Sequence, residues 1–241
     1  MLIDVQNLSV RFRGKSAVDG VSLQLSLGER VAIVGESGSG KSTLGRALLG
    51  LVAHPGLVVS DRLSIDGSEM SRAGQSDWRK IRGRIIGLML QDPRYSLHPT
   101  MTIGQQIGEV ADRAVGDCLA EVGLSPDIAR RYPHQMSGGQ GQRAYLAMAL
   151  AQHPKLLIAD EPTSALDPPM AAQMMALLGE RMSAERMGLL LITHDIDLAM
   201  QTCPRLLVMQ DGRIVEELLQ GQTPAHPFTQ RLIQSIPRLP C

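Results

Sequence analysis

The sequence predicts an α/β fold in which helices cover a parallel sheet. Three short apolar runs lie at residues 30–34, 156–159 and 189–193, and each has the continuous hydrophobicity of a strand that is buried on both faces. Helical character follows the first run at residues 42–49 and separates the other two at residues 170–182. Strands that alternate with helices in this way are typical of parallel sheets, whose functional side chains gather at the carboxyl ends of the strands.

Elements of a different kind flank this pattern. Residues 5–10 and 21–27 alternate between apolar and polar side chains, which predicts two half-exposed strands and an antiparallel β subdomain beside the parallel sheet. Near the end of the chain we expect a hairpin that turns at Asp211 and Gly212. A last short helix is expected over residues 227–236.

The stretch between the two halves of the predicted sheet has a helical pattern. Residues 103–115 and 117–122 are helix-like, and no strong strand pattern accompanies them. We therefore expect residues 95–136 to form an inserted helical subdomain. The chain of 241 residues suits one large domain with such a subdomain, and its core is expected to consist of residues 1–94 and 137–241.

Composition limits the possible functions. Lysine plus arginine equal aspartate plus glutamate at 24 each, so the broad positive field of a nucleic-acid-binding protein is not expected. Cys118, Cys203 and Cys241 show no C-x-x-C spacing, which argues against a disulfide framework or a zinc site and fits a reducing cytosol. No apolar run reaches the ~18 residues of a membrane span. A role at a membrane would therefore require a partner.

The first chemical motif is Gly35-Glu-Ser-Gly-Ser-Gly-Lys41-Ser42, which matches the phosphate loop G-x-x-x-x-G-K-[ST] between a predicted strand and a predicted helix. Its glycines allow backbone amides to converge on phosphate oxygens. We expect Lys41 to reach the β- and γ-phosphates of ATP and the Ser42 hydroxyl to bind Mg²⁺. A glycine-rich turn with an incidental lysine is the alternative. The expected ATP-binding residues of the loop are Gly35, Ser37, Gly38, Ser39, Gly40, Lys41, Ser42 and Thr43.

Polar side chains follow three further apolar strands. Asp160 is expected in the Mg²⁺ shell, and Glu161 is expected to polarise the attacking water as a general base. His194 would contact the γ-phosphate, and Gln91 would contact the metal or its water. Each has an ordinary alternative, since solvated acids often end strands and a lone histidine is usually structural. The phosphate loop in the same chain favours the functional interpretation.

A second glycine pair lies at Ser137-Gly138-Gly139-Gln140, before the alanine- and leucine-rich residues 142–150. Ser137 is a good N-cap, and a helix N-terminus attracts anions. Because the phosphate loop already cradles one nucleotide, we expect this segment to face a nucleotide that another chain holds. An ordinary capped helix would explain the serine, but not the two glycines and the glutamine.

In this order, and with Ser164-Ala-Leu-Asp167 added, these motifs resemble the ATP-binding cassette (ABC) ATPases over nearly the whole chain. The resemblance implies a P-loop NTPase core and a head-to-tail dimer in which each signature segment, Ser137–Gln140, closes over the ATP of the opposite subunit. It also implies that Asp167 lies in a loop crossing the dimer interface. Phe12 would stack on adenine near Ala17, although core packing of Phe12 is an alternative.

Further details are similar to the peptide/nickel importer branch of this family. They are the stretch from Gln91 to Gln106, the segment Arg131–His134 and the tail Thr223-Pro-Ala-His-Pro-Phe-Thr229. Met136 and Gly141 depart from the usual pattern. The short stretch between Gln91 and Ser137, and the end of the chain at residue 241, favour the shorter nickel or metal-chelate importers.

The resemblance therefore implies an ATP-hydrolysing subunit that energises a membrane importer for peptides or for nickel and metal chelates. ATP binding would close the cassette dimer and hydrolysis would reopen it. The implied partners are a second ABC ATPase, a paralogue more than a second copy, two permeases and, indirectly, an extracytoplasmic binding protein, at the cytoplasmic face of the inner membrane and without nucleic acid. The alternatives are an efflux ATPase and a soluble non-transport cassette, and balanced charge disfavours the second of these.

Overall fold

The computed structural model describes residues 1–90, 96–164 and 166–234. The chain divides into two compact units. The first unit comprises residues 1–78 and 189–241, and the second comprises residues 79–188.

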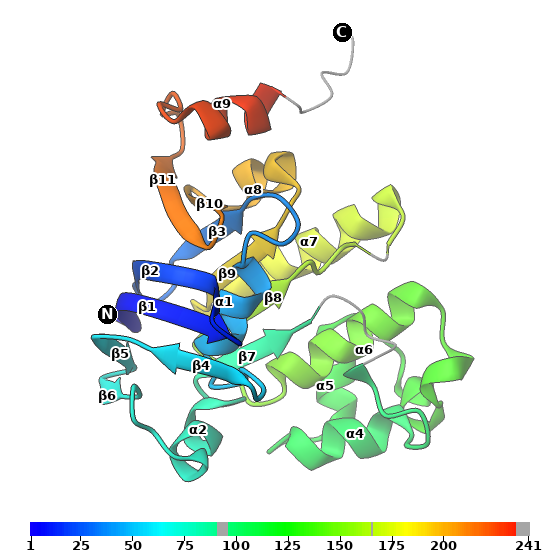
Figure 1. The fold of residues 1–241 in the computed structure, drawn as a ribbon. Coiled ribbons are helices and arrows are strands. Elements are labelled where there is room, and N and C mark those ends of the chain that lie inside the picture. The colour runs from blue at the N-terminus through cyan, green and yellow to red at the C-terminus, as the bar shows by residue number, and fades with distance from the viewer. Residues whose placement is uncertain (91–95, 165, 235–241) are drawn as a thin grey trace, which may run out of the picture. The chain divides into compact units, whose positions relative to one another are not determined.

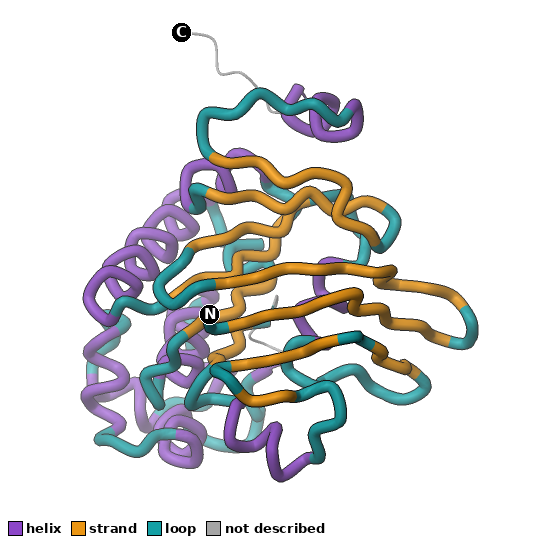
Figure 2. Tube along the Cα trace, turned by 90° about the vertical axis from the view of Figure 1, so that its left-hand side faces the viewer, coloured by secondary structure: helices purple, strands orange, loops and turns teal. Residues whose placement is uncertain are grey.

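An antiparallel sheet occupies the N-terminal part of the first unit (Figure 2). Its central strand, β1, pairs antiparallel with β2, β4 and β5, while β6 pairs with β5. Buried and exposed residues alternate along β1 and β2, as the two half-exposed strands predict. The strands are β1 (Ile3–Phe12), β2 (Lys15–Leu25), β4 (Gly56–Val59), β5 (Arg62–Ile65) and β6 (Ser68–Glu69).

The rest of the first unit contains the predicted parallel strands. Strand β3 (Arg30–Val34) lies between β9 (Gly188–Thr193) and β10 (Arg205–Gln210) and is parallel to both. Strand β11 (Arg213–Leu219) pairs antiparallel with β10, which confirms the predicted hairpin. The helices of this unit are α1 (Lys41–Ala47), α8 (Ile196–Thr202) and α9 (Pro227–Gln234), and α2 (Gln75–Ile81) crosses the boundary between the units.

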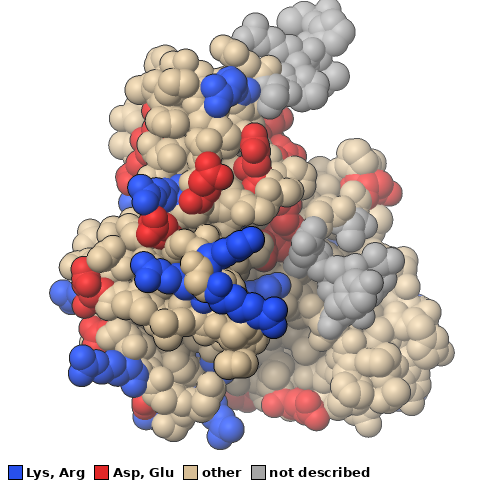
Figure 3. Space-filling model, in the orientation of Figure 1, with Lys and Arg blue, Asp and Glu red and all other residues tan. Residues whose placement is uncertain are grey.

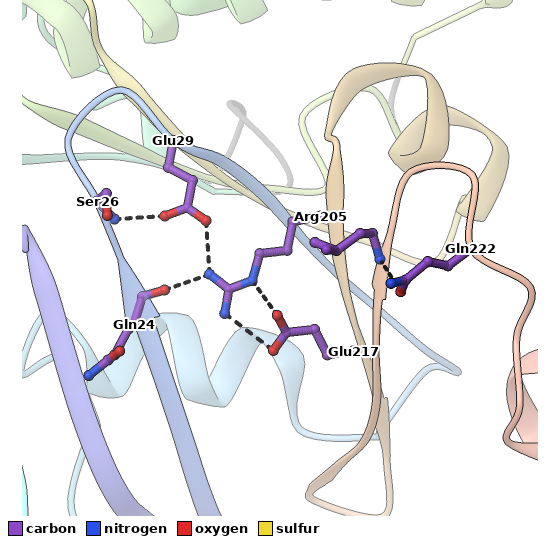
Figure 4. A network of polar contacts seen from close by, with 7 residues as sticks. Gln24, Ser26, Glu29, Arg205, Glu217 and Gln222 are labelled. Atoms are coloured by element: carbon purple, nitrogen blue, oxygen red, sulfur yellow. Dashed lines mark hydrogen bonds and ion pairs between the residues drawn. The ribbon is translucent and has the colours of Figure 1, made fainter.

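Arg205 forms ion pairs and hydrogen bonds with several strands and connections of the first unit (Figure 4). Arg205, at the start of β10, pairs with Glu29 at 2.9 Å and with Glu217 at 2.8 Å. Its guanidinium also donates to the carbonyl oxygen of Gln24 at 2.7 Å. Because Arg205 is only 18% exposed, these charge-assisted bonds hold the connection between β2 and β3 against the terminal hairpin.

The second unit combines a pair of parallel strands, β7 (Ile86–Met89) and β8 (Leu156–Asp160), with helices. Helices α4 and α5 contact α6 and the 3₁₀ turn over Pro126–Arg130 (Figure 1). Between residues 96 and 136 the described chain forms helices and turns without a strand, as its pattern predicts. The helices are α4 (Ile103–Val110), α5 (Val115–Glu121), α6 (Gly138–Leu150) and α7 (Pro168–Glu185), and a second 3₁₀ turn covers Pro133–Gln135.

Exposed charge of both signs covers the face of the molecule shown in Figure 3. Basic side chains gather there over β1 and β2. Three basic residues are exposed at this end of the two strands, namely Arg11 in β1, Arg13 in the connection and Lys15 at the start of β2.

Candidate functional site

The phosphate loop follows β3 as predicted, and α1 begins at Lys41. The buried Lys41 ammonium donates to the carbonyl oxygens of Gly35 and Glu36, each at 2.8 Å. The loop is therefore curled around its own lysine. Amide groups from Gly38 to Ser42 belong to the curve that the motif predicts for phosphate binding.

Two glycines of the loop leave no room for a side chain. A Cβ on Gly35 would lie 2.1 Å from the carbonyl oxygen of Met209 on β10. A Cβ on Gly40 would lie 2.2 Å from the carbonyl oxygen of Ala17 on β2. Real Cβ atoms do not approach an oxygen so closely, and both glycines have positive φ angles. Sequence reasoning missed the part of Met209, because every residue type carries a carbonyl.

The terminal hairpin supports the loop from another side. The amide of Gly212 donates to the carbonyl oxygen of Ser39 at 2.9 Å, and the amide of Asp19 donates to the carbonyl oxygen of Gly212 at 2.8 Å. The Ser39 hydroxyl is buried and has no hydrogen-bond partner among the residues that the structure describes. Ser37 and Gly38 are exposed, and a Cβ on Gly38 would meet no atom within 4 Å. A rigid loop with an open edge and an unsatisfied buried hydroxyl fits a phosphate chain.

The other residues of the first unit that the sequence predicts to bind ATP lie around this loop. Ser42 and Thr43 are half-buried in the first turn of α1. Ala17 lies beside the loop, as its contact position with Gly40 shows. Phe12 ends β1, is half-buried, and its ring packs on Gly56, where a Cβ would lie 2.6 Å from Cε1 of the ring. Stacking of Phe12 on adenine stays a prediction.

His194 lies at the strand end expected for it. Thr193, the last residue of β9, pairs with Val34, the last residue of β3, so His194 and Gly35 both follow strands that end at the same edge of the sheet. His194 is exposed. Asp195 caps α8 by accepting from the amide of Leu198 at 3.0 Å. The cap starts a new helix directly after the histidine and so holds its backbone.

The acidic pair lies in the second unit. Asp160 ends β8 and is 5% exposed. Glu161 follows in the left-handed region, with φ of 51°, which is strained for any residue with a Cβ. Its carbonyl oxygen accepts from both the amide and the hydroxyl of Ser164, at 3.2 and 3.1 Å. Gln91 lies outside the described residues.

The signature segment begins α6 with a full capping box. Ser137 Oγ accepts from the amide of Gln140 at 3.3 Å, and the Gln140 side chain accepts from the amide of Ser137 at 3.1 Å. Gln140 therefore has a role in helix capping within the chain. Gly139 is also explained internally, because its Cβ would lie 1.5 Å from the methyl group of Met170. Of the two glycines and the glutamine, Gly138 alone has no such role among the described residues. It is exposed, with open space around its α-carbon.

Asp167 is the N-cap of α7. One of its carboxylate oxygens accepts from the amide of Met170 at 2.9 Å, and the residue is exposed. Met170 thus contacts both Asp167 and the signature segment. This contact couples the start of α7 to the start of α6.

The two departures from the family pattern lie against each other. A Cβ on Gly141 would be 3.9 Å from the methyl group of Met136, which is an ordinary contact distance. Gly141 is buried in α6. The longer methionine therefore covers the surface of a residue that lacks a side chain.

The tail motif Thr223–Thr229 is folded against β11. Glu216 of β11 accepts from the amides of Ala225 and His226, at 2.6 and 3.1 Å. Phe228 is 4% exposed. The motif that points to the importer branch therefore has a structural role here, which is to attach α9. In the part of the chain that the structure describes, no helix has the length and hydropathy to cross a membrane.

Comparison with known proteins identifies the family of the chain. The family described as ABC transporter matches residues 18–164. The dipeptide transport ATP-binding protein DppD of Escherichia coli is 42% identical, over 98% of this chain and 78% of that protein. The oligopeptide transport ATP-binding protein AppD of Bacillus subtilis is 40% identical over the same shares.

Solved structures of ABC proteins have a similar fold. A dimeric post-hydrolysis state of the ATP-binding cassette MJ0796, bound to ADP and Pi, has a TM-score of 0.79 and 27% identity, covering 92% of this chain and 100% of the other. The cbiO1 protein of Clostridium perfringens has a TM-score of 0.75, covering 90% and 87% of the two chains. The α/β fold is therefore that of a P-loop ABC cassette, and the chain belongs to the ABC transporter family as one of its ATP-hydrolysing subunits.

Proposed function

We propose that this chain hydrolyses ATP to energise a membrane importer of peptides. The observation that carries the proposal is the 42% identity to a dipeptide transport ATP-binding protein over 98% of the chain. An oligopeptide transport relative at 40% identity supports the same cargo class. These relatives favour peptides over nickel or metal chelates.

In this proposal the phosphate loop binds the triphosphate of ATP. The buried Ser39 hydroxyl without a partner and the open edge at Gly38 support it. Lys41 then exchanges a loop carbonyl for phosphate oxygens, because an ammonium group prefers an anionic acceptor. His194 contacts the γ-phosphate from the neighbouring strand end.

Mg²⁺ fits the oxygen donors of the proposed site. Ser42, Asp160 and Gln91 would hold it, and the bound ion would offset the negative charge on the β- and γ-phosphates. No group of three histidine, cysteine or acidic residues that could hold a metal occurs among the described residues. Mg²⁺ does not require one, because it binds through few protein groups, phosphate oxygens and water. Glu161 orients and polarises the attacking water as general base.

The catalytic unit in this proposal is a head-to-tail dimer. The signature segment of one chain covers the ATP held by another, and Asp167 lies at the crossing. Support comes from Gly138, whose exposed backbone has no internal explanation, and from the related cassette MJ0796, which was solved as a dimer. ATP closes the dimer and hydrolysis reopens it.

The assembly includes two permease subunits, a paralogous ATPase and an extracytoplasmic binding protein that acts through them. Its place is the cytoplasmic face of the inner membrane. The relative cbiO1, described as part of an ABC transporter complex, supports a multi-subunit arrangement.

Uptake by whole cells tests this function. In cells that lack the chain, uptake of a labelled dipeptide should fall to the background level, and the wild-type chain should restore it. The Glu161→Gln chain should not restore uptake, since it keeps the phosphate loop but loses the general base. Immunoblots of membranes would verify that both chains are present in equal amounts.

Nickel uptake and efflux are measured in the same cells. Loss of nickel uptake with normal dipeptide uptake would replace the peptide cargo by a metal cargo. Increased retention of a preloaded dipeptide would indicate an efflux ATPase instead. Unchanged turnover of ATP in the purified Glu161→Gln chain would refute the role of Glu161.

A further inference from the structure

Gln142 is a buried polar residue that the proposed function does not use. It lies on α6, five positions after the N-cap Ser137, and its exposed fraction is 0%. Its side-chain Nε2 donates to the carbonyl oxygen of Pro162 at 2.5 Å. The hydrogen bond therefore joins the helix of the signature segment to the residue that follows Glu161.

The turn around Glu161 needs such support. Glu161 has a left-handed backbone, with φ of 51°, and a strained backbone persists only where its surroundings hold it. Ser164 holds the turn by its two hydrogen bonds to the carbonyl oxygen of Glu161. Gln142 holds the next carbonyl along the chain, that of Pro162. The peptide groups after Glu161 are thus restrained from two sides.

The other half of the Gln142 amide has no partner. Its Oε1 is buried and accepts no hydrogen bond from the described part of the chain. An unsatisfied buried oxygen costs free energy, whereas an apolar side chain of the same length would carry no such cost. What glutamine contributes at this position is therefore the one bond donated to Pro162.

We propose that Gln142 is a positioning residue for catalysis, which sets the backbone of Glu161 from the signature helix. This inference rests on the proposed role of Glu161 as general base. Both ends of the link belong to one compact unit. Ser137 and Gln142 are little more than one helical turn apart. A displacement of the signature segment is therefore transmitted to the turn around Glu161 through a short stretch of α6.

The Gln142→Met variant of the full-length chain tests the link, because methionine has a similar length and cannot donate. Steady-state hydrolysis should show kcat lowered about 10- to 100-fold, since small misplacements of a catalytic group cost this much. KM for ATP should remain at its wild-type value, and the thermal midpoint should fall by no more than a few degrees, because removal of the unsatisfied Oε1 partly offsets the loss of the bond to Pro162. The matched control is Gln173→Met, which removes an exposed contact between α6 and α7, the 2.9 Å bond from Arg143, and should leave kcat unchanged.

The Gln142→Glu variant gives a second readout that packing alone would not produce. A protonated glutamic acid can donate to the Pro162 carbonyl, whereas the ionised form cannot and is repelled by it. The ratio of its kcat to the wild-type kcat should therefore fall as the pH rises from 6 to 9, roughly following the ionisation of a buried carboxyl group. For Gln142→Met the same ratio should not change with pH.

Two outcomes would overturn the proposal. One is a wild-type kcat for Gln142→Met, and the other is a fall of more than a few degrees in its thermal midpoint together with a flat pH ratio for Gln142→Glu, which would make Gln142 a packing residue only. The Glu161→Gln variant separates this failure from failure of the function itself. If that variant loses turnover while Gln142→Met does not, Glu161 keeps its role and only the link to α6 is wrong.

Discussion

Among single residues, the glycines of the phosphate loop differ in what surrounds them. Gly38 and Gly40 both have positive φ angles, of 84° and 103°. A Cβ on Gly38 would meet nothing within 4 Å, whereas one on Gly40 would lie 2.2 Å from the carbonyl oxygen of Ala17. The two positions therefore separate backbone strain from steric overlap.

We predict different losses of stability for alanine at these positions. Gly38→Ala should lower the free energy of unfolding by about 1–2 kcal/mol, the cost of left-handed backbone for a residue with a Cβ. Gly40→Ala should cost about 1–3 kcal/mol more, because the side chain must displace β2 from the loop. Urea denaturation of both variants would measure this difference. Equal losses would mean that the Ala17 carbonyl yields without cost.

The side chains that we propose to act on ATP could be selected from the sequence, but the backbone groups that support them could not. Lys41 and Glu161 belong to motifs whose residue types the chemistry demands. The carbonyl groups of Ala17 and Met209 are not encoded by any residue type, and they approach the loop from strands that lie far away in the sequence. Gln142 was hidden for a related reason, since a glutamine within a helix gives no sign of burial.

At the scale of elements, burial decided which predictions succeeded. Strands β3 and β9 were found because nearly every residue in them is buried and apolar. Strands β4, β5 and β6 were missed because they have two to four residues and exposed positions. Helix α4 was expected to reach residue 115 but ends at Val110, where Ala111 turns to an extended backbone with ψ of 142°.

One ion pair fastens α5 to the segment that precedes it. Arg113 forms a double hydrogen bond with Glu121, and their side chains are 17% and 22% exposed. The bond from Arg113 lowers the pKa of Glu121 below its ordinary value of 4.5. A carboxyl group with a lowered pKa stabilises the fold above its unfolded pKa. This stability is lost as the pH falls through the lower folded pKa.

We therefore predict that Glu121→Gln lowers the free energy of unfolding at pH 7 by about 1–2 kcal/mol, a value kept small by partial exposure to solvent. The difference from wild type should shrink as the pH falls below 4.5. Denaturation with urea at several pH values would measure it. The exposed pair of Asp127 and Arg131, at 56% and 40% exposure, provides the control. Hydrogen bonds from Ser125 and Arg131 also lower the pKa of Asp127, but solvent screens this pair, so Asp127→Asn should lower the free energy of unfolding by less than Glu121→Gln does. A difference for Glu121→Gln that does not depend on pH would contradict this account.

For the whole molecule, the proposed site draws on distant parts of the chain. The first unit carries the phosphate loop and His194, while the second carries Asp160, Glu161 and the signature segment. From the segment Ser137–Gln140, the sequence predicts a second subunit whose nucleotide faces this segment. The structure narrows that argument, because the capping box accounts for Gln140 and Met170 accounts for Gly139. The case for a partner nucleotide at this segment now depends on Gly138 and on the exposed start of α6.

Substitutions of Ser137 test the dimer, because the effect of a bulky side chain can be measured separately from the loss of the helix cap. Ser137→Arg should leave binding of ATP by the single chain unchanged but abolish ATP-driven dimerisation, because the long side chain would occupy the place of the partner's γ-phosphate. Ser137→Ala is the control, since it removes the hydrogen bond to the Gln140 amide without adding bulk and should cost about 1 kcal/mol of helix stability. Light scattering with ATP, in chains that also carry Glu161→Gln to prevent turnover, would report the dimer. If the Ser137→Arg chain still dimerised with ATP, the signature segment would not face a nucleotide held by another subunit, and the proposed head-to-tail arrangement would be wrong.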